Sequence, residues 1–367
     1  MAERMVVQGN EALGWGAVMA GCRHFFGYPV TPQNEVTEWF ARELPKWGGR
    51  FVQSESEASS IAMLFGAAAA GVRAITSTAG PGWGLMQEGM SHLANAELPC
   101  VVVDVQRGGP GQGTTRHAQQ DYKSVTRGGG QGDYRNIVLA PASIQENYEL
   151  IQLAFHLADT YRIAVVLLSD GIVGQMAEPL ELKELDFGPV PEKDWALAGS
   201  GQKGGRSGFI GCMQGLIPPD TFLGFLGRLK KKYDDIERSE VRYEEVEMRD
   251  AELAVVAYGY TARSALEAVQ LVRQAGLKVG LVRPLTVWPF PYKPLEEAAN
   301  RGVKLLVVED SLGQMLEDVR LAASGKVEVG LVGILDRHDP SDGGMILPNA
   351  IFDKIVKMLG REVPSPW

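Results

Sequence analysis

Residues 73–105 read RAITSTAGPGWGLMQEGMSHLANAELPCVVVDV and contain the pattern on which the fold prediction depends. Residues 73–77 and 100–105 are short runs rich in β-branched residues without strict alternation of apolar and polar positions, and residues 84–96 between them are long enough for a helix. Unalternating strands joined through helices are typical of a parallel sheet that is covered on both faces. This stretch therefore predicts a βαβ unit.

The same alternation extends over the first 185 residues. Four further strands are expected, at residues 23–26, 50–53, 136–139 and 163–168. Helices are expected at residues 11–21, 34–44, 57–70 and 143–160. In a doubly wound sheet, ligands bind at the carboxyl ends of the strands, where the strand order reverses. We therefore expect the site in the loops that follow Phe26, Ile75, Val105 and Leu168.

A segment of different composition divides the chain. Residues 199–211 are rich in Gly and Ser and are expected to form a mobile loop. Residues 228–250 are dense in charge, which predicts a solvated helix with an extended exit. A length of 367 residues, at roughly 150 residues per domain, also suggests two domains.

A second α/β pattern follows this segment. Strands are expected at residues 253–258, 278–283, 304–309 and 327–334, and helices at residues 261–275, 291–300 and 313–323. We therefore predict an α/β protein in which a doubly wound parallel sheet precedes a smaller α/β domain. The predicted units are residues 1–185, a connecting segment at residues 186–250, and residues 251–367.

The composition excludes several classes of protein. With 36 Lys and Arg against 45 Asp and Glu, the net charge is −9, which argues against nucleic acid or an anionic membrane as the main partner. No apolar run approaches the ~18 residues of a membrane helix, and the first residues do not resemble a secretory signal. Three cysteines without a CxxC spacing favour reduced thiols over a disulfide framework or a metal site. We therefore expect a cytoplasmic protein.

The loop after the first predicted strand, Tyr28-Pro29-Val30-Thr31-Pro32, is stiff because two prolines fix its backbone. Thr31 is a candidate cap for the next helix, with Pro32 at its first position. The alternative is a strand-end loop that presents the hydroxyl of Thr31 to an anionic substrate. The residues alone favour the cap.

Glu57 opens an alanine-rich helix after the second predicted strand. Ser54 and Glu57 have the spacing of a capping box, which is the structural interpretation. The helix that follows is lined with small residues and suits close contact with another subunit or a cofactor. A carboxylate in such a place can share a proton with a ring nitrogen.

Two further loops have ligand-binding character. Ser77, Thr78 and Gly80 follow a strand, although hydroxyls and glycines are also ordinary in turns. Arg107 stands before a glycine-rich run and suits capture of a carboxylate, with an ion pair as the equal alternative. His117 lies in the same loop and is either near the substrate or solvated. A P-loop is excluded because Thr114 occupies the lysine position.

Other motifs are absent from the sequence. There is no G-x-S-x-G elbow, no G-x-G-x-x-G between a strand and a helix, and no metal-ligand spacing. The chain also lacks Gly-Asp-Gly, and Ser169-Asp170-Gly171 is the nearest sequence.

Three ordered blocks resemble a known family: GNEALGWGAVMAGCRHFFGYPVTPQNE, ESEASSIAMLFGAAAAGVRAITSTAGPG and DVQRGGPGQG. With the downstream pieces LSDG, LVRPLTVWPFP and VVEDSLGQMLEDVR, they are similar to the α subunit of 2-oxoacid:ferredoxin oxidoreductases over nearly the whole chain. The glycine-rich loop most resembles chains for branched-chain 2-oxoacids, with the 2-oxoglutarate type second.

The resemblance implies a thiamine diphosphate enzyme that is divided among subunits. This chain would supply a pyrimidine-binding domain and a transketolase-C-terminal-like domain. A partner β subunit would hold the diphosphate with Mg²⁺ and carry [4Fe-4S] clusters, so no metal ligand is expected here. Further γ and ferredoxin-like δ subunits, ferredoxin, the 2-oxoacid and coenzyme A complete the implied partners.

The resemblance also implies roles for site residues. Glu57 would contact N1′ of the aminopyrimidine, and Thr31 and Arg107 would contact the carboxylate and keto oxygen of the substrate. Contacts with the cofactor are implied for a set of loop residues: Tyr28, Pro29, Ser77, Thr78 and Gly80.

The implied reaction is oxidative decarboxylation of a 2-oxoacid to acyl-CoA and CO₂, with electrons passed to the iron–sulfur clusters of the partners. Two alternatives stay open on the sequence: a non-oxidative thiamine enzyme such as a decarboxylase or transketolase-like chain, and a non-catalytic subunit such as half of an electron-transfer flavoprotein.

Overall fold

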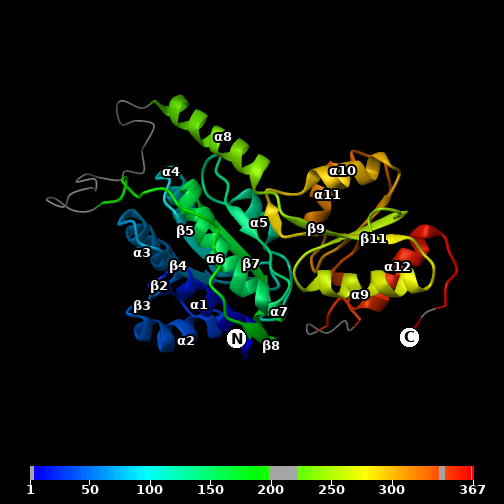
Figure 1. Cartoon of the computed structure of the whole chain (residues 1–367), viewed down its shortest axis with the longest axis horizontal. Helices are drawn as coiled ribbons and strands as arrows, with labels where there is room; N and C mark the ends of the chain where they lie inside the picture. The colour runs from blue at the N-terminus through cyan, green and yellow to red at the C-terminus, as the bar shows by residue number, and fades with distance from the viewer. Residues whose placement is uncertain (1–3, 198–220, 339–343, 365) are drawn as a thin grey trace.

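The structure, a computed structural model, describes residues 4–197, 221–338, 344–364 and 366–367. It contains two α/β units, one at each end of the molecule (Figure 1). The predicted mobile loop at residues 199–211 and Cys212 lie outside the described residues. The predicted fold class is confirmed, and most predicted strands and helices are present with ends that differ by one or two residues.

The first unit is built on a seven-stranded sheet with the order β12-β6-β7-β5-β4-β2-β3. Every neighbouring pair is parallel except β12 with β6. The strands are β2 (His24–Gly27), β3 (Arg50–Gln53), β4 (Ala74–Thr78), β5 (Cys100–Gln106), β6 (Ile137–Leu139), β7 (Ala164–Asp170) and β12 (Thr286–Trp288).

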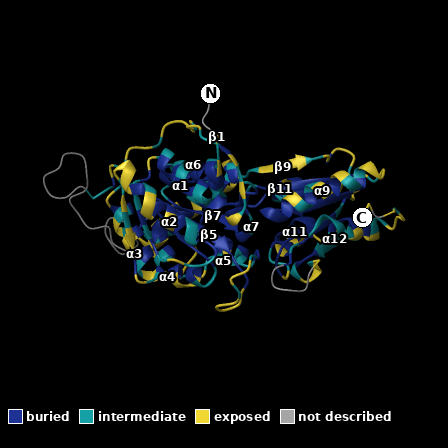
Figure 2. Cartoon of the chain, turned by 90° about the horizontal axis from the view of Figure 1, so that it is seen from below, coloured by how far each residue is buried: buried dark blue, intermediate teal, exposed yellow. Residues whose placement is uncertain are grey.

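Helices cover both faces of this sheet. They are α1 (Gly9–Met19), α2 (Asn34–Glu43), α3 (Glu57–Ala69), α4 (Pro81–Asn95), α5 (Tyr122–Arg127), α6 (Ile144–Tyr161) and α7 (Gly171–Gln175). In β4, β5 and β7 every residue is buried, as the unalternating strand pattern predicts. These central strands are the dark core of the first unit in Figure 2.

The second unit has a five-stranded sheet with the order β14-β13-β10-β11-β9, in which only β9 is antiparallel to its neighbour. Its strands are β9 (Tyr243–Val246), β10 (Leu253–Ala257), β11 (Val279–Pro284), β13 (Lys304–Val308) and β14 (Val329–Val332). The helices here are α9 (Tyr260–Gln274), α10 (Tyr292–Asn300), α11 (Met315–Ala323) and α12 (Pro348–Leu359).

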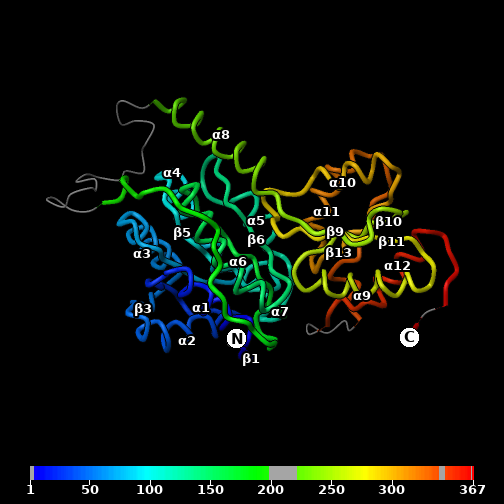
Figure 3. The backbone as a smooth tube through the Cα atoms, in the orientation of Figure 1, coloured from blue at the N-terminus to red at the C-terminus, as the bar shows by residue number. Residues whose placement is uncertain are grey.

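The connection between the units contains α8 (Phe222–Ser239) followed by the short strand β9, as the charge pattern predicted. In the tube drawing of Figure 3, α8 runs along the first unit and leads into β9 of the second. A separate two-stranded ribbon pairs β1 (Arg4–Gln8) with β8 (Ala177–Glu181).

Some elements were not predicted. β12 lies among the residues assigned to the second domain but joins the first sheet through β6, which ties the two units together. Its three residues are too few for a period to be recognised. The predicted helix at residues 84–96 begins earlier, at Pro81, because proline fits the first turn of a helix, where no N–H bond is needed. The helices α5, α7 and α12 were also not foreseen.

The first sheet reverses its strand order between β2 and β4. From β2 the chain moves to β3 at the edge, and it then returns to β4 on the other side of β2. The loops after these strands diverge from this point and leave room for a ligand. The carboxyl ends of β2, β4 and β5 therefore define the place where a site is expected.

Candidate functional site

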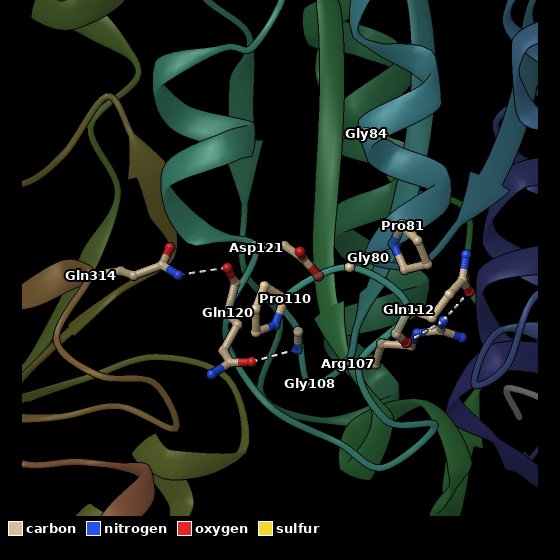
Figure 4. Close-up of a pocket in the computed structure, with 12 residues that line it drawn as sticks. Gly80, Pro81, Gly84, Arg107, Gly108, Pro110, Gln112, Gln120, Asp121 and Gln314 are labelled. Carbon is tan, nitrogen blue, oxygen red and sulfur yellow. Dashed lines mark hydrogen bonds between the residues drawn. The ribbon is translucent and has the colours of Figure 1, made fainter.

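A pocket of about 690 Å³ lies at these carboxyl ends. One wall is the start of α4, another is the glycine-rich loop after β5, and Gln314 closes it from the second unit (Figure 4). Its lining comprises Gly80, Pro81, Gly84, Arg107, Gly108, Gly109, Pro110, Gly111, Gln112, Gln120, Asp121 and Gln314. Of the predicted site residues, Gly80 and Arg107 line this pocket directly.

Arg107 is 7% exposed and is the only cationic side chain in that lining. Its Nη1 donates to the carbonyl oxygen of Thr31 at 2.9 Å, and its Nη2 donates to the carbonyl oxygen of Gln112 at 2.8 Å. Its buried Nε has no hydrogen-bond partner. Within the described chain no carboxylate forms an ion pair with Arg107, so the ion-pair interpretation is wrong. The guanidinium therefore keeps donor capacity and charge for a ligand.

Thr31 does not cap α2. That helix begins at Asn34 after Gln33, with no side-chain cap, so the capping interpretation of Thr31 is wrong. The hydroxyl of Thr31 instead accepts a hydrogen bond from Asn34 Nδ2 at 3.2 Å, and its carbonyl holds Arg107. The chain folds back through Pro32 before the helix can start, which leaves the Thr31 hydroxyl outside it.

Gln33 joins the loop after β2 to the neighbouring strand β4, a role that no sequence pattern predicted. Its Nε2 donates to the carbonyl oxygen of Tyr28 at 2.9 Å, while its Oε1 accepts from the hydroxyl of Ser77 at 2.6 Å. Tyr28 is half-buried and Pro29 is exposed. Neither of these two residues, nor Ser77 or Thr78, lines the pocket that contains Arg107.

Glu57 is the first residue of α3 and is 5% exposed. The capping-box interpretation is wrong, because the cap is Ser56, whose hydroxyl accepts from the amide of Ser59 at 3.3 Å. The Glu57 carboxyl reaches the first turn of α4, where a Cβ on Gly82 would overlap both Glu57 Oε1 and the hydroxyl of Thr78. Only glycine lets the Glu57 carboxyl and the Thr78 hydroxyl approach the start of α4 this closely.

Two buried polar atoms near the start of α4 have no hydrogen-bond partner. They are the hydroxyl oxygen of Thr78 at the end of β4 and the indole nitrogen of Trp83 in α4. Buried polar groups in folded proteins are nearly always paired, so an unpaired hydroxyl on Thr78 at the end of a strand indicates a position for a ligand. Glu57, Thr78 and Gly82 therefore form a second polar cluster. None of these three residues lines the pocket that contains Arg107.

A pair of buried carboxyl groups was missed. Asp104 in β5 is fully buried, and neither carboxyl oxygen has a partner. Burial, with the charge of Asp121 as a second cause, holds the pKa of Asp104 well above its usual range. Burial likewise raises the pKa of Asp121 to about 6. A single aspartate within the run CVVVDV was the one sign of this pair in the sequence.

His117 lies between the two units instead of in the pocket. Its side chain is 10% exposed, and Nε2 is 3.1 Å from the carbonyl oxygen of Gly344. Burial lowers its pKa. Neither the substrate-contact nor the solvated interpretation of His117 fits this position.

Among the described residues no group of three or more His, Cys, Asp or Glu side chains is placed to hold a metal ion. Within the same ranges no helix is long and apolar enough to cross a membrane.

Two family models match the chain. Residues 15–245 match "Pyruvate flavodoxin/ferredoxin oxidoreductase, thiamine diP-bdg", a thiamine diphosphate-binding domain. Residues 251–344 match "Pyruvate:ferredoxin oxidoreductase core domain II".

Curated relatives match over almost their full length. The ketoisovalerate oxidoreductase subunit VorB of Methanothermobacter marburgensis is 47% identical over 366 residues, which cover 98% of this chain and 99% of the relative. The 2-oxoglutarate synthase subunit KorA of the same organism is 38% identical over 381 residues, with 98% and 100% covered.

Two solved structures are also similar to this chain. The 2-oxoglutarate:ferredoxin oxidoreductase from Magnetococcus marinus, determined with 2-oxoglutarate, coenzyme A and succinyl-CoA bound, superposes with a TM-score of 0.86 at 27% identity. The match covers 97% of this chain but 65% of that longer chain. A split-gene transketolase, as an inactive β4 tetramer, matches 96% of this chain and 98% of its own with a TM-score of 0.60 at 15% identity, which shows the fold alone.

Proposed function

The chain belongs to the 2-oxoacid:ferredoxin oxidoreductase family, and we propose from this premise that it is the subunit that binds the aminopyrimidine of thiamine diphosphate and the carboxylate of a branched-chain 2-oxoacid. The observation that carries the proposal is that a buried glutamate packed against Gly82 and an arginine with an unpartnered, buried Nε both lie at the carboxyl ends of the strands of one sheet. The non-oxidative alternative has no support, since the transketolase likeness concerns the fold.

The residues present fit the pyrimidine end of thiamine diphosphate. An aminopyrimidine ring needs an acidic partner at a ring nitrogen, hydrogen-bond partners at its edge and a backbone that permits close approach. Glu57 provides the carboxyl and Thr78 an unpaired hydroxyl, and Gly82 lets both groups approach the start of α4 closely. Tyr28, Pro29, Ser77 and Gly80 are further proposed contacts at the ends of the same strands.

The proposed chemistry divides the work between the coenzyme and this chain. When bound, thiamine diphosphate supplies the electron sink for decarboxylation. Glu57 would hold a proton at the ring nitrogen, a form of general acid–base assistance that typically contributes ~10²–10⁴-fold. Arg107 would hold the substrate carboxylate and Thr31 would orient the keto oxygen, so both would act by positioning.

The pocket lining favours a branched-chain substrate over 2-oxoglutarate. Arg107 is the one cation in this lining, and it would neutralise the carboxylate that every 2-oxoacid carries. The second carboxylate of 2-oxoglutarate would then have no counter-charge there and would face Asp121. A branched apolar side chain has no such cost. The 47% identity to a ketoisovalerate oxidoreductase subunit supports the same substrate class.

The remaining components are proposed to come from partner subunits. A β subunit would hold the diphosphate with Mg²⁺ and the [4Fe-4S] clusters, with γ, ferredoxin-like δ and ferredoxin as further partners and coenzyme A as acyl acceptor. Exposed apolar side chains near Glu57 support a subunit contact here: Val52 is 38%, Met63 39% and Leu85 58% exposed.

The proposed location is the cytoplasm. Cys22 and Cys100 are buried and free, and burial raises the pKa of each thiol to about 12. Such thiols are unreactive and are suited to a reducing compartment.

The experiment is purification of this chain with its native partner subunits under nitrogen, followed by assays with a 2-oxoacid panel, coenzyme A and a viologen acceptor. We expect kcat/KM for ketoisovalerate to exceed that for 2-oxoglutarate by at least about tenfold, since a missing charge partner is costly. The chain alone should contain no iron and show no activity. A complex that prefers 2-oxoglutarate would contradict the substrate assignment, and an active isolated chain would contradict the divided site.

A further inference from the structure

Gln119, in the return half of the glycine-rich loop, is buried in the edge of the second sheet. Its side chain is 0% exposed. Its Nε2 donates to the carbonyl oxygen of Tyr258 at 2.9 Å, and its Oε1 accepts from the amide of Asp310 at 2.9 Å and the hydroxyl of Thr261 at 3.2 Å. Its own amide donates to the carbonyl oxygen of Asp310 at 2.8 Å. Both ends of the side-chain amide are thus satisfied by the second unit.

This contact occupies a place where α/β sheets usually bind ligands. Tyr258 follows β10 and Asp310 follows β13, two adjacent parallel strands, so Gln119 enters the crevice at their carboxyl ends. The backbone there is shaped to receive it. Gly259 has a φ of +60°, and a Cβ at this position would lie 2.6 Å from Gln119 Nε2. The second sheet therefore holds a glutamine of the first unit in this crevice.

The segment that carries Gln119 is also bonded to Arg107. Arg107 pairs with His117 in an antiparallel bridge, and the amide of Gly108 donates to the carbonyl oxygen of Arg116 at 3.1 Å. On the pocket side, the amide of Gly109 donates to Gln120 Oε1 at 2.6 Å. The return segment and the strand end that carries Arg107 are therefore one short ladder.

The second unit holds the same ladder at two further points. Gln314 Nε2 donates to the carbonyl oxygen of Gln120 at 2.6 Å, a contact that is visible in Figure 4. Arg337 Nη2 donates to the carbonyl oxygen of His117 at 2.8 Å. The outer half of the loop, where Pro110, Gly111 and Gln112 are exposed, contacts the guanidinium instead: Arg107 Nη2 donates to the carbonyl oxygen of Gln112 at 2.8 Å. The backbone position of Arg107 is therefore held from the return segment, while Thr31 and Gln112 hold its guanidinium.

We propose that Gln119 is a positioning residue through which the second unit holds Arg107 at the correct place for the carboxylate of the 2-oxoacid. This rests on the proposed function of Arg107. Misplacement of a binding group by a fraction of an ångström weakens a charge-assisted hydrogen bond, because such bonds depend steeply on distance and angle. Through Gln119 and Arg107 the second domain thereby acts on the affinity for the 2-oxoacid.

The test uses the complete complex with Gln119→Met, which keeps the length of the side chain but removes both amide contacts. We expect KM for the 2-oxoacid to rise roughly three- to tenfold, while kcat and KM for coenzyme A change by less than about twofold. Thr261→Val loosens the same contact from the second unit and should raise KM in the same direction by less. If the Gln119→Met chain does not assemble with its partner subunits, Thr261→Val provides the measurement of KM instead.

Tyr122→Phe is the matched control. It removes an interdomain hydrogen bond, from the Tyr122 hydroxyl to Asp318 Oδ2 at 2.8 Å, outside the ladder of Arg107. A purely structural role for Gln119 predicts that both variants lower the thermal midpoint and leave KM alone. The proposal predicts that only Gln119→Met raises KM. Equal KM values in the two variants would overturn it.

A double-mutant cycle separates this inference from the proposed function. If Gln119 acts through Arg107, Gln119→Met should add little to the KM of Arg107→Ala. Full additivity of the two effects would overturn the inference. If Arg107→Ala itself leaves KM unchanged, the assignment of Arg107 fails. If Arg107→Ala raises KM and Gln119→Met does not, only the positioning role fails.

Discussion

The carboxyl-end edges of the two sheets both bury acidic side chains, but they satisfy them differently. In the second unit, the Glu309 carboxylate accepts hydrogen bonds from the amides of Gln314, Met315 and Leu316 and from the hydroxyl of Ser311. In the first unit, both carboxyl oxygens of Asp104 lack a partner. Both strand ends therefore carry a buried acidic residue, but only Glu309 in the second unit has hydrogen-bond partners for its carboxyl oxygens.

This difference extends beyond the acids. Among the described residues, every buried side-chain nitrogen or oxygen without a partner belongs to a residue between Asn10 and Asn136. Asp310 in the second unit, by contrast, accepts from the hydroxyl of Tyr260 at 2.7 Å and from Arg337 Nε at 2.8 Å. A satisfied polar network fixes one arrangement, whereas an unsatisfied one is costly unless a ligand completes it. Of these residues, Thr78, Asp104 and Arg107 lie at the carboxyl-end edge, which is therefore prepared for binding, whereas the second edge is prepared for support.

The largest expected effect on activity is at the carboxyl-end edge of the first sheet, where buried polar groups lack partners. Glu57→Gln should lower kcat of the assembled complex about 10²–10⁴-fold, because the amide cannot exchange a proton with the ring nitrogen. The thermal midpoint should stay close to that of the wild type. Steady-state kinetics and a thermal melt measure the two. A variant that turns over at nearly the wild-type rate would remove Glu57 from the mechanism.

Arg107→Ala should raise KM for the 2-oxoacid roughly 10–100-fold with a smaller change in kcat, since a charge-assisted hydrogen bond to the substrate is lost. Arg283→Ala is the matched control. Arg283 is also a buried arginine, but its Nη2 is paired with Glu146 at 2.7 Å and with Glu244 at 2.9 Å. The control should lower stability without changing KM, and a similar KM in both variants would count against the assignment of Arg107.

At the carboxyl-end edge of the second sheet, where the buried acidic residues have hydrogen-bond partners, a substitution should change stability and not activity. Glu309→Gln should lower the free energy of unfolding by about 2 kcal/mol. The side-chain NH₂ group of glutamine would replace one carboxylate oxygen and, being a donor, could not accept the hydrogen bonds of the backbone amides that it faces. Activity per folded complex should be unchanged. Denaturant titration, with activity scaled to the folded fraction, measures both. Lost activity without lost stability would show that the second edge also takes part in catalysis.

The smallest effect concerns pH and the carboxyl pair. The native pKa of Asp121, about 6, lies above the ordinary value of 3.8, so the proton it holds favours the native state at low pH. That contribution is fully present below pH ~3.8 and is lost as pH rises through about 6. Relative to Asp121→Asn, the wild type should lose about 1 kcal/mol between pH 5 and 8. Parallel stability curves for the two proteins would show that the carboxyl group titrates normally.

Much of this molecule is predictable from its sequence because its central strands are buried on both faces. The run CVVVDV has no hydrophilic face, and that pattern fits few structures other than the middle of a parallel sheet. The loops after such strands are then the place for a site, and they contain Thr31, Glu57 and Arg107, whose roles the family resemblance implied. The same local reasoning failed at caps, where Thr31 and Ser54 had the right chemistry but the chain turned elsewhere.

By itself the sequence determined the order of strands and helices, the family and the residue types available at each strand end, since these depend on local periodicity and ordered motifs. The tertiary structure alone decided which side chains meet. The contact of Glu57 with Gly82, the carboxyl pair of Asp104 and Asp121, and the insertion of Gln119 into the second sheet join segments that are distant in the chain. These contacts depend on how whole helices and strands pack against one another, and no local sequence pattern encodes them.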